Sequence, residues 1–192
     1  MKLFAPAKKA LVLALLLCAV APIVAFAADE KPAVLQDFKY RVTGLFAPDR
    51  VEDLRKLVAQ LPDVKLVSVD YKSAEAVFSY DPAKLGGGGK PEKAMERLDN
   101  LVRNASRSTF GIKPLCTTPR DQLTLIEVGV LGLDCKGCAF AAYEAVAKLD
   151  GVEQATASFK IGLVTALIDP KKTDRAAIEA ALKQRQVELK KP

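Results

Sequence analysis

Residues 132–138 read GLDCKGC, a glycine-bearing turn that carries two cysteines three positions apart. The segment before the turn, which ends at Leu131, has the apolar composition of a strand, and residues 139–146 have the apolar spacing of a helix. Cys135 and Cys138 are therefore predicted to lie in a strand-to-helix turn. A dithiol in such a turn can bind a metal ion, exchange disulfides or form a static disulfide.

The elements around this turn occur twice in the chain. In the second half, the pattern predicts strand, helix, strand, strand, helix and strand over residues 123–131, 136–149, 152–159, 163–168, 173–182 and 187–189. In the first half, it predicts the same order, with a loop over 86–89, over residues 38–44, 48–61, 64–69, 74–80, 91–102 and 110–115. Gly44–Pro82 aligns with Gly132–Pro170 without a gap, which indicates an internal duplication.

Each half must bury one face of its sheet, and two amphipathic helices on the same side can do so. The order of elements therefore predicts an α+β protein of two tandem ferredoxin-like βαββαβ domains. We expect the first domain over residues 38–115, a linker over 116–122 and the second domain over 123–190. In the alignment Ala47 and Arg50 stand where the second domain has its two cysteines, so the first domain has the fold without the thiols.

The N-terminal segment has the pattern of a cleavable signal peptide. Three lysines within residues 2–9 precede an apolar run over 11–24, and Ala25-Phe26-Ala27 supplies a small-x-small cleavage pattern. We predict a signal peptide over residues 1–27, cleavage after Ala27, a linker over 28–37, and a secreted or periplasmic location. An uncleaved membrane anchor is the alternative, whereas Leu17 before Cys18 argues against a lipoprotein. No other segment is long and apolar enough to span a bilayer.

The charge of the chain points to no particular partner. Lys and Arg number 29 against 23 Asp and Glu, and three of the lysines belong to the predicted signal peptide. No basic run is interleaved with aromatic residues, so we expect no nucleic-acid partner.

Removal of the signal peptide leaves three cysteines, of which one is far from the pair. Cys116 follows the first domain, and the strand over 123–131 separates it from the turn by roughly 30 Å at 3.3 Å per residue. We expect Cys116 to be a lone structural thiol, with an intermolecular disulfide as the alternative.

Two thiolates suit an ion of low coordination number. Cys138 is expected in the first helical turn, where free backbone N–H groups should lower its pKa. Soft ions such as Cu(I) or Hg(II) accept two sulfur ligands, whereas structural Zn(II) takes four. The chain contains no histidine, so any further ligand must come from oxygen, water or a second molecule.

Residues 132–138, followed by Leu149-Asp150-Gly151-Val152 and a predicted hairpin, resemble the heavy-metal-associated domain. This family includes copper metallochaperones, N-terminal domains of metal-exporting P-type ATPases and the periplasmic mercury-binding protein. The resemblance covers residues 123–189, and the first domain matches in pattern only. The family motif is usually Gly-Met-x-Cys-x-x-Cys, so Leu133 replaces a methionine that normally packs under the loop. The resemblance implies a ferredoxin-like fold and metal binding by Cys135 and Cys138.

Two further residues are candidates for an accessory role at the metal. An acidic residue before the first cysteine is common in family members that carry zinc or cadmium, and Asp134 could supply an oxygen ligand. Its alternatives are a solvated carboxylate or a helix cap. Arg185 lies in the turn that the family places beside the metal loop, where a cation would offset the charge of two thiolates; the alternative is a solvated helix end. The prediction favours Cu(I), with Zn(II), Cd(II) and Hg(II) open.

These features together predict a non-enzymatic, exported protein that buffers a soft metal ion or delivers it by ligand exchange. The partner would be a metal donor or acceptor such as a metal-transporting ATPase. One alternative is a thiol–disulfide redox protein that uses the same two cysteines, and another is an interaction module with a static disulfide. The thiol-free domain is expected to pack or dock, and to offer Tyr40, Phe46 and Val51 to a partner.

Overall fold

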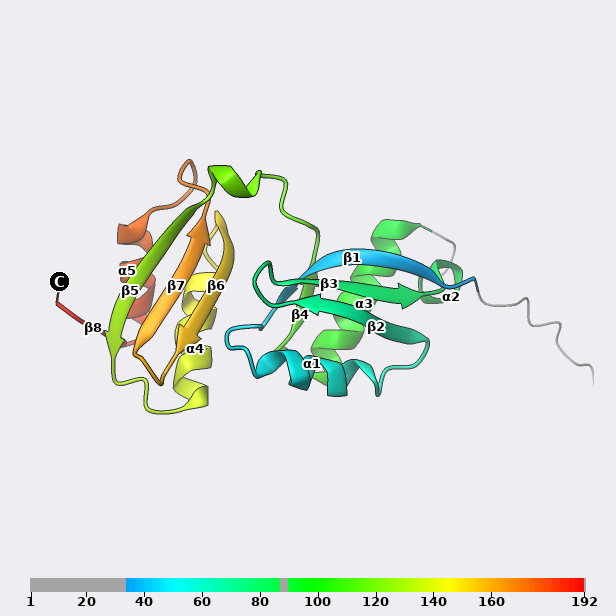
Figure 1. Cartoon of the computed structure of the whole chain (residues 1–192), viewed down its shortest axis with the longest axis horizontal. Helices are drawn as coiled ribbons and strands as arrows, with labels where there is room; N and C mark the ends of the chain where they lie inside the picture. The colour runs from blue at the N-terminus through cyan, green and yellow to red at the C-terminus, as the bar shows by residue number, and fades with distance from the viewer. Residues whose placement is uncertain (1–33, 87–89, 192) are drawn as a thin grey trace, which may run out of the picture. The chain divides into compact units, whose positions relative to one another are not determined.

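The computed structural model describes residues 34–86 and 90–191 (Figure 1). The predicted signal peptide and its cleavage site lie outside the described residues, as do most of the linker over 28–37 and of the loop over 86–89. No helix among the described residues has the length and apolar character needed to cross a membrane.

The first domain is a four-stranded antiparallel sheet in the order β2-β3-β1-β4. Its elements, in chain order, are β1 (Gln36–Thr43), α1 (Arg50–Val58), β2 (Val64–Asp70), β3 (Glu75–Tyr80), α2 (Pro82–Gly86), α3 (Pro91–Ala105) and β4 (Gly111–Lys113). The short helix α2 was not predicted; it begins at a proline, which suits a first helical position. The last strand is shorter than predicted because Pro114 has no N–H to continue the ladder.

The second domain repeats this topology in the order β6-β7-β5-β8. After the short 3-10 helix Arg120–Gln122 come β5 (Thr124–Leu131), α4 (Lys136–Ala147), β6 (Val152–Ser158), β7 (Leu163–Ile168), α5 (Arg175–Gln184) and β8 (Glu188–Leu189). The prediction of two tandem ferredoxin-like domains is therefore confirmed.

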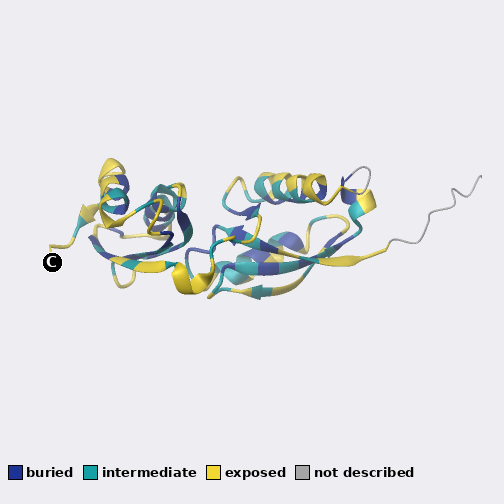
Figure 2. Cartoon of the chain, turned by 90° about the horizontal axis from the view of Figure 1, so that it is seen from above, coloured by how far each residue is buried: buried dark blue, intermediate teal, exposed yellow. Residues whose placement is uncertain are grey.

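Burial alternates in the same way along the matching strands of the two domains. Ala76, Phe78 and Tyr80 are buried in β3, and the aligned Val164, Ala166 and Ile168 are buried in β7. Each strand therefore turns one face to a core, and the helices cover that core with their apolar sides (Figure 2). The repeated sequence pattern therefore corresponds to the same alternation of buried and less buried positions in both sheets.

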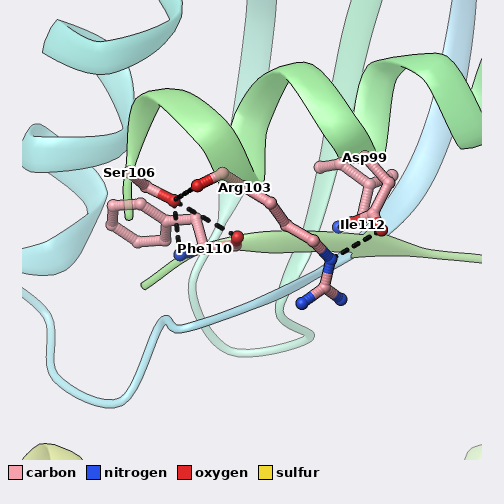
Figure 3. A network of polar contacts seen from close by, with 5 residues as sticks. All are labelled: Asp99, Arg103, Ser106, Phe110 and Ile112. Carbon is pink, nitrogen blue, oxygen red and sulfur yellow. Dashed lines mark hydrogen bonds and ion pairs between the residues drawn. The ribbon is translucent and has the colours of Figure 1, made fainter. Parts of the chain in front are cut away.

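A network of polar contacts holds the junction between α3 and β4 (Figure 3). The carboxylate of Asp99 accepts hydrogen bonds from the backbone N–H of Ile112 and from Nε of Arg103, both at 2.6 Å. The hydroxyl of Ser106 accepts a hydrogen bond of 3.0 Å from the backbone N–H of Phe110. These contacts fix the final strand of the first domain against its helix.

Alanine at the two aligned glycines should have unequal costs. Gly44 and Gly132 both have positive φ, +92° and +71°. A Cβ at Gly44 would lie 2.1 Å from the carbonyl oxygen of Thr109, whereas a Cβ at Gly132 would meet nothing within 4 Å. Gly132→Ala should lower the free energy of unfolding by about 1 kcal/mol, the cost of the backbone conformation alone. Gly44→Ala should cost more than about 2 kcal/mol because a backbone clash adds to that conformation. Urea unfolding of both variants measures the difference, and equal losses would contradict it.

Candidate metal-binding site

The turn over residues 132–138 is held from below by one apolar side chain. Leu133 is 7% exposed and belongs to the core of the second domain, as expected for the residue in place of the family methionine. Gly132 turns the chain with a positive φ, so that the residues after Leu133 return to the surface. The loop is thus fixed at its base and exposed at its thiols.

Cys135 caps the helix that carries Cys138. Its sulfur accepts a hydrogen bond of 3.2 Å from the backbone N–H of Cys138, the third residue of α4. This contact assigns the capping role to the cysteine, so the alternative that Asp134 caps the helix is wrong. Asp134 is exposed.

The two sulfur atoms lie 2.8 Å apart and both cysteines are free thiols. This separation is longer than the roughly 2.05 Å of a disulfide bond. It is shorter than the roughly 3.8 Å between two thiolates that bind one tetrahedral ion through bonds of about 2.3 Å. Cys135 is exposed and Cys138 is half-buried. A small movement of an accessible loop therefore reaches either arrangement.

The two thiols share a contact in which either sulfur could donate, and the backbone N–H of Cys138 favours Cys135 as the acceptor. The pKa of Cys135 is lowered, first by the hydrogen bond from the thiol of Cys138 and then by the backbone N–H groups of Cys138 and Gly137. The pKa of Cys138 is raised by the same thiol contact, then by partial desolvation. The expectation of a lowered pKa at Cys138 is wrong, because the thiol contact with Cys135 and desolvation outweigh the backbone groups of Asp134 and Cys135 at the helix start. Cys135 therefore loses its proton first.

Alkylation should reveal this difference. With limiting iodoacetamide, Cys135 should react before Cys138, by about threefold for each pKa unit between them once the lower nucleophilicity of the more acidic thiol is included. Because the pKa of Cys135 is lowered, its reactivity should persist to a lower pH than that of an ordinary cysteine, and the reactivity of Cys138 should appear only at higher pH. Peptide mass spectrometry over a pH series checks this, and earlier modification of Cys138 would contradict it.

The third thiol lies at the opposite end of the second sheet. Cys116 is half-buried beside Glu153, and its pKa is raised mainly by burial. In the sheet, Ile168 pairs with Val152 on one side and with Thr124, at the start of β5, on the other. Glu153 directly follows Val152. From there β5 runs seven residue steps, about 23 Å, to the turn. The register therefore supports the expectation that Cys116 is no ligand at the dithiol.

Among residues 34–86 and 90–191, no group of three His, Cys, Asp or Glu side chains could hold a metal ion. Arg185, the predicted accessory cation, is exposed at the C-terminal end of α5. Within the described chain it makes no ion pair or side-chain hydrogen bond. Its role, like that of Asp134, stays a prediction.

The first-domain loop that aligns with the dithiol turn contacts the second domain directly. All described residues belong to one compact unit. Phe46 is 4% exposed and packs in the second core, with ring centroids 5.5 Å from Phe140 and 5.7 Å from Tyr143. Its carbonyl accepts a hydrogen bond from Ala157 N–H, and the N–H of Gly44 donates to Tyr143 Oη at 2.6 Å. The expectation that these residues face a partner is therefore wrong: Phe46 packs in the second domain of the same chain, and Tyr40 and Val51 pack in the first core.

One of these contacts reaches the dithiol loop. Lys136, between the two cysteines, pairs with Asp49 at 2.5 Å, and its hydrogen bond is the main cause of the lowered pKa of Asp49. This pair could not be foreseen from either residue alone. The contact between the domains could have been inferred from a difference between the two aligned helices. Phe140 and Tyr143 on α4 stand where α1 has the charged residues Glu52 and Arg55.

The chain is similar to several solved structures of metal-handling proteins, although no family model and no curated protein matches its sequence. A CopZ metallochaperone is 22% identical over 35% of this chain and 100% of its own, with a TM-score of 0.34. The N-terminal soluble domains of Bacillus subtilis CopA are 18% identical over 82% of this chain and 94% of theirs, also at 0.34. Oxidised MerP from Ralstonia metallidurans CH34 is 19% identical over 35% and 94%, at 0.34. At these identities the likeness concerns the fold alone.

Proposed function

We propose that the chain is an exported, non-enzymatic protein that holds a soft metal ion between Cys135 and Cys138 and passes it on by ligand exchange. The observation that carries the proposal is an exposed dithiol, with sulfurs 2.8 Å apart, on a fold whose other copy forms without cysteines. Because the fold does not need the thiols, their presence in one copy indicates a chemical task.

The unequal acidities suggest how an ion enters and leaves. Cys135 supplies the first thiolate, and binding of the ion displaces the proton that Cys138 retains, so loading releases that proton. On transfer, an incoming thiolate of the partner binds the ion before a protein sulfur leaves and is reprotonated. An acceptor with its own dithiol, such as the N-terminal domain of a metal-transporting ATPase, fits this exchange.

The ligand set favours Cu(I) as the cargo. Two sulfur ligands complete a low coordination number that Cu(I) accepts and Zn(II) does not. Zn(II) or Cd(II) would need a further ligand, and Asp134 is the adjacent oxygen donor. Hg(II) would need no further ligand. Export rests on the signal-like pattern of residues 1–27.

The proposal is tested by titration of the reduced mature chain with Cu(I) and Zn(II) against a competing chelator. We expect one tight site for Cu(I) and weaker binding of Zn(II). Absence of binding for both ions would overturn the proposal.

The close sulfurs also favour a second candidate, thiol–disulfide exchange. A lowered pKa at Cys135 and an adjacent protonated thiol are features that a redox dithiol needs. A reduction potential more oxidising than about −200 mV, together with no metal binding, would support this function. A disulfide that resists reduction would instead support a static disulfide in an interaction module.

A further inference from the structure

Two like charges face each other on adjacent strands of the first sheet. Arg41 of β1 is directly opposite Lys113 of β4 in the register, an arrangement that destabilises a sheet unless a counter-charge is present. Arg41 has a counter-charge, since it pairs with Glu153. Within the described chain, Lys113 has no ion-pair partner, and burial followed by the charges of Arg41 and Arg103 lowers its pKa. The sheet thus holds a half-buried ammonium without a direct ion pair among the described residues, although the nearby carboxylates of Glu153 and Asp99 partly offset the lowering of its pKa.

A cavity of about 100 Å³ lies beside this ammonium. Three cationic side chains line it, together with three hydroxyl-bearing residues from the end of β1 and the turn after α3, and one carboxylate: Lys113, Arg103, Lys148, Thr43, Ser108, Thr109 and Glu144. The volume equals that of about three waters in the liquid. A small polyatomic ion therefore has room in it.

The existing ion pairs leave donors free for such an ion. Arg103 uses Nε to bind Asp99, as Figure 3 shows, and the two other guanidinium nitrogens have no hydrogen-bond partner among the described residues. Glu144 pairs with Lys148 at 3.2 Å, so the one carboxylate at the cavity is already neutralised. The charge that remains at the wall is positive, from Lys113.

The turn at the cavity is held in an uncommon conformation. Arg107 and Ser108 both have positive φ, 51° and 63°, which side-chain-bearing residues rarely adopt. The hydroxyl of Ser106 fixes this turn through the backbone of Phe110. The backbone thus brings Ser108 and Thr109 to the cavity wall, where each hydroxyl is a potential donor.

We propose that this cavity binds a small tetrahedral oxyanion of the phosphate or sulfate class. The guanidinium of Arg103 supplies paired N–H donors, Lys113 supplies the point charge, and the turn supplies hydroxyl groups. The bound anion would neutralise Lys113 opposite Arg41. The cations must outweigh the dipoles at the C-terminal ends of α3 and α4, which disfavour an anion there. The site contains no cysteine, so it is independent of the proposed metal site.

Thermal unfolding and calorimetry of the mature chain in sulfate and phosphate test the proposal, with chloride at matched ionic strength as the reference. We expect saturable one-to-one binding and a rise of the unfolding midpoint that chloride does not produce. Lys113→Met, which keeps most of the apolar stem, should weaken binding at least tenfold and should raise stability in chloride because it removes the like-charge pair. Lys65→Met on β2, away from the cavity, should leave binding unchanged.

Equal responses of the wild type and Lys113→Met would overturn the proposal, since they would show a general salt effect. If Lys113→Met does not fold, Lys113→Gln provides the same comparison. Vesicles with anionic phosphate headgroups form a second arm: binding of free phosphate without vesicle binding supports an enclosed ion site, and vesicle binding without free-ion binding overturns it. Cys135→Ser should keep the anion response, so failure of the metal proposal and failure of this one are distinguishable.

Discussion

Phe46→Ala should lower the free energy of unfolding by about 3–5 kcal/mol, the range for removal of a fully buried phenylalanine. Phe46 belongs to the chain of the first domain but is buried in the core of the second, against Phe140 and Tyr143. Its ring also lies 5.2 Å from the guanidinium of Arg50, which adds a cation–π contact. The loss should therefore affect both domains, although the substitution is made in one. Urea unfolding measures the free energy.

A second phenylalanine provides the matched control for this prediction. Phe38 packs on Tyr80 at 4.6 Å inside the first domain, so Phe38→Ala should destabilise without affecting the contact between domains. Hydrogen exchange distinguishes the two variants. The amides of Gly44 and Ala157, which donate across that contact, should lose protection in Phe46→Ala and keep it in Phe38→Ala. A loss below about 1 kcal/mol with protection retained would show that Phe46 is not essential to the contact.

The two domains could be predicted well because the same order of strands and helices occurs twice in the sequence. Each half therefore supports the assignment of the other. Leu45 and Leu133 are aligned and both are buried, at 2% and 7% exposure, so the base of each loop follows from the repeat. The next aligned pair, Phe46 and Asp134, has no such agreement. One is buried in the other domain and the other is exposed in solvent. A repeat therefore predicts what both copies share, and the function of each loop lies where they differ.

The limits of the site prediction have the same physical origin. The identity of Cys135 and Cys138 as the candidate ligands followed from spacing along one helix start, which is local information. The direction of the pKa of Cys138 did not, because it depends on which thiol donates to the other. The pair of Asp49 with Lys136 depends on a contact between domains, which neither local pattern contains.

Cys135→Ser should abolish tight Cu(I) binding, with a loss of affinity well above the 10- to 100-fold that changes around a metal ligand produce. A serine hydroxyl is a hard, neutral donor under these conditions, whereas Cu(I) requires a thiolate. Cys138→Ala should have a similar effect on affinity and a further effect on acidity. It removes the side-chain donor to Cys135, which a serine hydroxyl would replace, so the pKa of Cys135 should rise toward the ordinary value. Chelator competition measures the affinity, and alkylation against pH measures the acidity.

Two control substitutions separate the ligands from their surroundings. Cys116→Ser should bind as the wild type does, because Cys116 lies beside Glu153 at the far end of β5. Asp134→Asn should change Cu(I) affinity less than tenfold but should weaken Zn(II) binding more, if the carboxylate serves the harder ion. Binding that survives Cys135→Ser and is lost in Cys116→Ser would contradict both the ligand assignment and the strand register. Loss of Cu(I) binding in Asp134→Asn would instead mean that the carboxylate positions the loop, since an amide of the same shape keeps its size but not its charge.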